Sequence, residues 1–65
     1  MKILIGAGGM AVDYLSYNSP AYGVNLIDDF KTGNVLGHPI IGTISDFIEN
    51  RNLMPHPEVY NCIGS

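Results

Sequence analysis

The chain has 65 residues, which is enough for one domain at most. Its net charge is −3, and its three basic residues, Lys2, Lys31 and Arg51, are too scattered to form the cationic face that nucleic-acid binding requires. The single cysteine excludes an intrachain disulfide and a paired-cysteine zinc site, and no apolar run approaches the ~20 residues of a membrane span.

Short apolar runs alternate with helical patterns in the first half of the chain. Residues 2–5 form a continuous apolar run ended by glycine, which predicts a strand buried on both faces. Residues 10–17 carry a helical apolar stripe, and Asn18-Ser19-Pro20 ends it. Strand character resumes over residues 23–27.

The second half of the chain repeats this alternation less regularly. Residues 35–42 read as a short extended piece, and Pro39 indicates an edge or irregular strand because it lacks a backbone donor. Thr43 and Asp46 have the spacing of a capping box, which predicts a helix start. Residues 58–63 read as the last strand.

This order of elements predicts the fold class. Strands that alternate with helices imply parallel pairing through right-handed crossovers, so we expect an α/β fold. Its form would be a three-layer, Rossmann-like half-domain with a small parallel sheet. Such folds continue into another helix after the last strand, so we expect residues 1–65 to be a single domain from a longer protein.

Three glycines lie within four positions between the first strand and the first helix. Gly6, Gly8 and Ala11 fit G-x-G-x-x-[GA], in which the glycines allow a tight turn and a close approach to pyrophosphate. The free N–H groups of the following helix favour an anion at the same place, beside Gly9 and Met10. The pattern predicts a phosphate-binding loop; the alternative is a turn needed only for packing.

Two acidic residues end the second strand. Asp28 stands 20 residues after Gly8, where a carboxylate can accept hydrogen bonds from a ribose, and Asp29 is its candidate partner. The alternative is that both merely cap a strand and solvate a loop. Gly64, at the tip of the last strand, is a further candidate on the same sheet edge. The lone Cys62 reads as a buried, inert thiol.

The sequence holds no nucleophile with its base, no carboxylate pair at catalytic spacing and no metal-binding cluster. The residues therefore support binding and no catalysis by this chain alone. The single cysteine and the lack of a signal peptide predict a cytoplasmic protein.

The stretches "GAGG", "LIDD" and "VLGHPIIGTISDF", followed by a final strand that ends in "IG", resemble the N-terminal domain of bacterial PglD/NeuD-like sugar O- and N-acyltransferases. The resemblance spans nearly all of the chain. It implies a small domain that holds a nucleotide-sugar of the UDP-sugar type. It implies that Gly8 and Gly9 lie on the phosphate side, Asp28 and Asp29 at the nucleotide, and Ile41 near the nucleobase.

The family also has a C-terminal left-handed β-helix of hexapeptide repeats, which binds acetyl-CoA, supplies a catalytic histidine and forms a trimer. This sequence contains none of it. The resemblance thus implies acetyl-CoA for a longer, homo-oligomeric acetyltransferase of polysaccharide biosynthesis, and no cofactor for this domain.

One stretch departs from the family. Directly after the glycines the family carries His, a small residue and then Lys or Arg, whereas this chain has Met10, Ala11 and Val12. Two alternatives stay open. One is the NAD-binding half of an oxidoreductase, with Asp28 favouring NAD over NADP. The other is a non-enzymatic regulatory module whose glycine loop serves packing.

Overall fold

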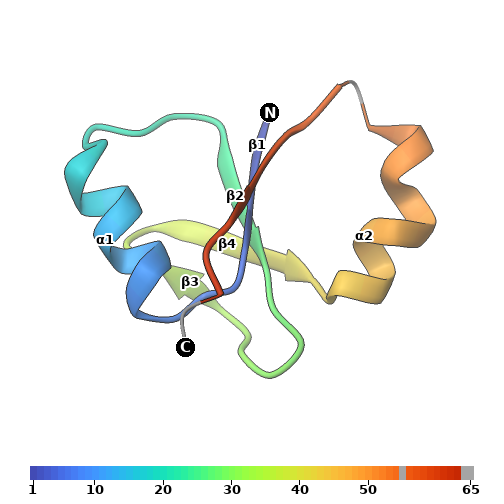
Figure 1. Cartoon of the computed structure of the whole chain (residues 1–65), viewed down its shortest axis with the longest axis horizontal. Coiled ribbons are helices and arrows are strands. Elements are labelled where there is room, and N and C mark those ends of the chain that lie inside the picture. Colours follow the sequence, from blue (N-terminus) through green and yellow to red (C-terminus); the bar gives the residue numbers. More distant parts are fainter. Residues whose placement is uncertain (55, 64–65) are drawn as a thin grey trace.

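The computed structural model describes residues 1–54 and 56–63. In this part of the chain, five strands form one sheet in the order β3-β4-β2-β1-β5, and two α-helices lie on opposite sides of it (Figure 1). The strands are β1 (Lys2–Ile5), β2 (Val24–Ile27), β3 (Asn34–Val35), β4 (His38–Gly42) and β5 (Glu58–Asn61). The helices are α1 (Gly9–Tyr17) and α2 (Ile44–Asn50), and a 3-10 turn, η1 (Arg51–Leu53), follows α2.

The α/β class predicted from the sequence is confirmed. The pairs β1–β2, β1–β5 and β2–β4 are parallel. The crossover from β1 to β2 contains α1, and the crossover from β4 to β5 contains α2. Because β1 lies between β2 and β5, the two crossovers run in opposite directions along the sheet. When both crossovers are right-handed, as is usual, opposite directions put the two helices on opposite faces of the sheet.

The expectation of a wholly parallel sheet is wrong at one point, because β3 and β4 pair antiparallel. A two-residue turn joins them, and both of its residues have positive φ, 49° at Leu36 and 83° at Gly37. Positive φ at both central residues gives a turn whose twist suits a tight hairpin. Residues 35–42, expected as one extended piece, are therefore part of a hairpin.

Pro39 lies in β4, between β3 and β2, so its placement at a sheet edge is wrong. The predicted irregularity is present, since the register between β2 and β4 shifts between Leu26 and Ile27. The first residue of β4 in register with β2 is Ile40, directly after Pro39. The missing N–H group of the proline thus lies at the end of the parallel ladder, where its loss breaks little pairing.

The core lies chiefly between the sheet and α1. Strand β1 is buried on both faces, as its unbroken apolar run predicts, and both Ile3 and Leu4 are fully buried. Since neighbouring strand residues point to opposite faces, Leu4 contributes to the α1 side and Ile3 to the other. The buried cluster consists of Leu4, Ala7, Ala11, Leu15, Val24, Leu26 and Cys62.

Helix α2 begins at the predicted capping box. The Thr43 hydroxyl accepts a hydrogen bond from the Asp46 N–H at 3.1 Å, and the Asp46 carboxylate accepts one from the Thr43 N–H at 3.0 Å. No residue of α2 is fully buried, although Ile44 and Phe47 are half-buried, so the capping box is a clear local source of stability for this helix. No helix in the described part of the chain is long and apolar enough to pass through a membrane.

Candidate functional site

A cleft of about 540 Å³ lies at the sheet edge where the parallel strands end. Its walls come from the loop after β1, the loop after β2, the start of α2 and the residues after β5. This volume falls within the roughly 300–1,000 Å³ of small-molecule sites. The lining residues are Gly6, Ala7, Gly8, Gly9, Met10, Asp28, Asp29, Phe30, Lys31, Ile44, Cys62 and Ile63.

Six of the eight site residues predicted from the sequence line this one cleft: Gly6, Gly8, Gly9, Met10, Asp28 and Asp29. Ile41 does not. It lines a smaller hollow of about 180 Å³ between β4 and α2, and Ile44 lines the cleft instead. Gly64 lies outside the described residues; Cys62 and Ile63, just before it, contribute to the wall.

Gly6 is required by the fold itself. Its φ is +100°, and a Cβ built on it would lie 3.0 Å from the Cys62 carbonyl oxygen. Residues with a side chain rarely adopt this backbone conformation, and the chain at the end of β5 leaves no room for a Cβ. Gly6 therefore serves the close approach of the glycine loop to the end of β5.

Gly8 and Gly9 meet no such constraint. A Cβ on Gly8 would have one heavy atom within 4 Å, the Lys31 Nζ at 4.0 Å, and a Cβ on Gly9 would have none. Both residues line the cleft. Their lack of side chains leaves backbone open to whatever occupies the cleft, which is the feature that a close-approaching phosphate uses.

The first turn of α1 faces the same cleft. Gly8 is the N-cap, and no side chain caps this end of the helix. The N–H groups of a first turn have no acceptor within the helix, and they carry the positive end of the helix dipole. The carbonyl of Gly8 is already used, since it accepts a hydrogen bond from the Val12 N–H at 3.1 Å. The cleft thus receives donors from α1 and favours an anion.

The Asp28 carboxylate accepts hydrogen bonds from three backbone N–H groups. Its Oδ2 accepts a hydrogen bond from the Ala7 N–H, and its Oδ1 accepts from the Phe30 and Lys31 N–H groups, all at 2.8 Å. These bonds, with Phe30 the strongest contributor, lower the pKa of the carboxyl, and partial burial opposes them. A carboxylate has roughly four acceptor positions, and three are occupied here.

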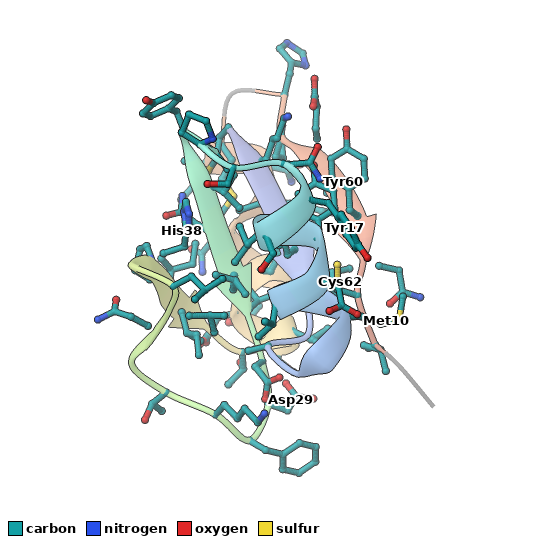
Figure 2. All side chains as sticks on the ribbon, turned by 90° about the vertical axis from the view of Figure 1, so that its left-hand side faces the viewer. Met10, Tyr17, Asp29, His38, Tyr60 and Cys62 are labelled. Carbon is teal, nitrogen blue, oxygen red and sulfur yellow. The ribbon has the colours of Figure 1, made fainter. Side chains whose placement is uncertain are left out.

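Asp29 links the same loop to α2. Its Oδ1 accepts a hydrogen bond at 3.0 Å from the N–H of Ile44, the first residue of that helix. Among residues 1–54 and 56–63 this is the hydrogen bond that its carboxylate makes, so the acceptor positions of Oδ2 are unoccupied within these residues, and Asp29 lines the cleft. Figure 2 shows Asp29 below α1, at the end of the molecule where β2 finishes.

Lys31 is one of six lining residues that were not predicted for the site from the sequence. Its Nζ donates a hydrogen bond to the Ala7 carbonyl at 3.4 Å. Both backbone polar groups of Ala7 are therefore bound by the loop after β2, because Asp28 accepts from its N–H. Its position could have indicated this place, because Lys31 follows Asp28 by three residues, which is the spacing of a turn that an aspartate side chain caps.

The remaining wall is apolar. Met10 is 47% exposed, while Cys62 is only 5% exposed, and its burial raises the pKa of the thiol. Cys62 follows β5, which ends at Asn61, whereas the sequence placed it inside a strand. Figure 2 shows Cys62 beside α1, the helix that carries Met10 in its first turn. The thiol is buried, as expected, and within the described residues burial alone shifts its pKa, upward, which disfavours the nucleophilic thiolate.

The arrangement offers backbone donors, one ammonium group, two partly engaged carboxylates and an apolar wall, which together can bind a phosphorylated ligand. In the part of the chain that the structure describes, no group of three or more His, Cys, Asp or Glu side chains is placed to hold a metal ion. No protein-family model, curated protein or solved structure matches this chain.

Proposed function

We propose that this chain is a nucleotide-sugar-binding domain of the UDP-sugar type, and that it positions the substrate of a cytoplasmic sugar acetyltransferase in bacterial polysaccharide biosynthesis. The observation that carries the proposal is the cleft in which the glycine loop after β1 meets the acidic loop after β2. Sequence motifs 20 residues apart, those of Gly8 and Asp28, thereby become two walls of one cleft.

The strand order supports a Rossmann-like half-domain. Without the short β3, the parallel strands follow the order β4-β2-β1-β5, which is third-second-first-fourth along the chain. That order is the one found in nucleotide-binding doubly wound sheets, where ligands bind outside the carboxyl ends of the strands at the point where the strand order reverses. Here that point lies between β1 and β5, beside Gly6 and Cys62.

The chemistry of the walls suits a nucleoside diphosphate. The open backbone at Gly8 and Gly9 and the first turn of α1 would receive the diphosphate, since N–H groups and a helix dipole favour negative charge. Asp29 Oδ2 would accept from a hydroxyl or amide of the ligand. The apolar side chains of Met10 and Ile63 would cover the less polar parts.

The NAD alternative fits the cleft less well. An NAD-type site uses an acidic residue in the position of Asp28 to accept hydrogen bonds from ribose hydroxyls. Three backbone N–H groups already occupy this carboxylate, which leaves room for one further donor. We therefore favour the nucleotide-sugar, whose recognition would rest on Asp29, on Lys31 and on the backbone.

The domain would contribute to the reaction by positioning the sugar relative to the catalytic centre. Holding the sugar beside a catalytic centre raises the effective concentration of the acceptor group, which alone accelerates transfer strongly. The lining residues include no base next to a nucleophile, so the transfer of an acetyl group from acetyl-CoA to the sugar would take place in a further domain. Hexapeptide repeats after residue 65 in the natural gene product would support this part of the proposal; their absence would contradict it.

A thermal-shift panel with UDP-N-acetylglucosamine, UDP, NADH and CoA tests the binding function. A ligand that binds only the folded chain, present at a hundredfold excess over its Kd, adds about 2.7 kcal/mol and raises the Tm of so small a domain by about 10 °C or more. We expect this rise with the two uridine ligands. A rise with NADH alone would favour the oxidoreductase alternative, and no rise with any ligand would favour a regulatory module.

A further inference from the structure

The charge on the cleft is unusual for a site that would hold a diphosphate. Its lining includes two carboxylates, those of Asp28 and Asp29, and one ammonium group, that of Lys31. The other two basic residues lie elsewhere: Lys2 is in β1, and Arg51 begins η1. Helix α1, which faces the cleft, contains no Lys or Arg at all. Any side-chain cation for a bound phosphate must therefore come from Lys31.

The position of Lys31 is fixed at its backbone. The Lys31 N–H donates to Asp28 Oδ1 at 2.8 Å, and the same carboxylate accepts from the N–H of Ala7 through its other oxygen. The loop that carries the lysine and the glycine loop are thus held together by one side chain. This connection holds the backbone of Lys31 near the glycine loop, and its Nζ reaches the Ala7 carbonyl there.

The ammonium group lies over the open part of that loop. It is 3.4 Å from the Ala7 carbonyl oxygen, a long and weak hydrogen bond, and 4.0 Å from the point where a Cβ of Gly8 would be. An ammonium has three donors, and within the described residues it donates to this carbonyl. A phosphate that approached the backbone of Gly8 would therefore meet donors ready to bind it.

We propose that Lys31 is the specificity-determining residue of this cleft, and that its ammonium group selects a nucleoside diphosphate over the monophosphate and the nucleoside. This inference rests on the proposed function. The two carboxylates repel an anionic ligand, and the lysine compensates for that repulsion where the phosphates lie. The second phosphate adds negative charge within reach of the lysine, whereas a nucleoside brings none.

Isothermal titration of the wild-type chain and of Lys31→Gln with UDP, UMP and uridine tests the proposal. A charge-assisted hydrogen bond that is lost weakens binding by about tenfold to a hundredfold, and we expect this loss for UDP. The loss should be smaller for UMP and absent for uridine. Lys31→Arg, which keeps the charge, should restore most of the UDP affinity.

Lys2→Gln is the matched control, because it removes the same charge at the other end of the sheet, where β1 begins. Lys31 is exposed, and the Tm of each variant checks that it folds as the wild type does. If Lys31→Gln and Lys2→Gln lower UDP affinity equally, or if Lys31→Gln weakens uridine as much as UDP, the specificity role is wrong while the nucleotide site stands. If the wild type binds none of the three, the proposed function and this inference both fail.

Discussion

The Asp28 carboxylate lies 2.8 Å from the backbone nitrogen of Ala7, a residue 21 positions earlier in the chain, and accepts its hydrogen bond. Through its other oxygen it accepts from Phe30 and Lys31. One side chain thus sets the distance between the loops that follow β1 and β2. In nucleotide-binding motifs the residue in the position of Asp28 contacts the ligand. Here Asp28 holds together the two loops that form the cleft in which the ligand would lie.

Replacing Asp28 with Asn should destabilise the fold. An amide has one acceptor oxygen in place of two, so either the Ala7 N–H or the pair from Phe30 and Lys31 loses its partner. We expect the free energy of unfolding to fall by about 1–3 kcal/mol. Urea unfolding followed by circular dichroism measures this, with Asp13→Asn on the exposed side of α1 as the control. Equal stability of the two variants would show that the carboxylate does not hold the loops.

The Asp28 carboxylate should make the free energy of unfolding depend on pH in the acidic range. The backbone hydrogen bonds hold the pKa of folded Asp28 below its unfolded value of about 3.9. The ionised form therefore stabilises the fold above about pH 4, and this contribution is lost as the pH falls through the folded pKa. The stability difference between wild type and Asp28→Asn should stay constant from pH 7 to pH 5 and narrow below pH 4. A difference that does not change with pH would contradict this account.

Gly6→Ala should be more damaging than the same substitution at Gly33. Gly6 and Gly33 both have φ near +100°, but a Cβ on Gly33 would meet no heavy atom within 4 Å, whereas one on Gly6 would meet the Cys62 carbonyl. Comparing the two variants separates steric crowding from backbone strain. We expect Gly6→Ala to lower the free energy of unfolding by about 1–3 kcal/mol more than Gly33→Ala does. Equal losses would mean that strain alone explains both.

Removing the cap of α2 should weaken that helix. Thr43→Ala deletes the hydroxyl that accepts the Asp46 N–H, and no residue of α2 is buried to compensate. A lost N-cap costs about 0.5–2 kcal/mol. Hydrogen exchange of the α2 amides should accelerate, whereas Ser45→Ala, on an exposed position of the same helix, should leave their exchange unchanged. Unchanged exchange in Thr43→Ala would show that the capping box does not stabilise α2.

Local patterns predicted the parts of the fold that local forces determine. The unbroken apolar run of β1 indicated burial on both faces, and the spacing of Thr43 and Asp46 indicated where α2 begins. The hairpin between β3 and β4 was missed because Leu36 holds a positive φ that side chains normally avoid. Its turn lacks the Asn-Gly or Asp-Gly pair by which such hairpins are usually found.

Six of the eight residues predicted for the candidate site line the cleft, whereas their contacts were not predicted. The glycine loop and the acidic loop were placed together because parallel strands end at one edge of a sheet. The partners of Asp28 could not be predicted, since the Ala7 N–H comes close only when the two loops are folded side by side. The contact of Lys31 with the glycine loop depends on the same folding of the two loops. Ile44 lines the cleft in place of Ile41, because the residue that faces the cleft depends on where β4 ends.

The most direct test of the central claim is the affinity of UDP-N-acetylglucosamine for the wild type and for Gly8→Ala, measured by isothermal titration. A Cβ on Gly8 meets only the Lys31 ammonium, at 4.0 Å, and Ala is a poorer N-cap than Gly, so the fold should lose about 1 kcal/mol of stability at most. The added methyl group would nevertheless stand where the diphosphate approaches the backbone. We predict binding to the wild type and a loss of at least about tenfold in the variant. Equal affinity for both chains, or no binding to the wild type, would contradict a nucleotide-sugar site in this cleft.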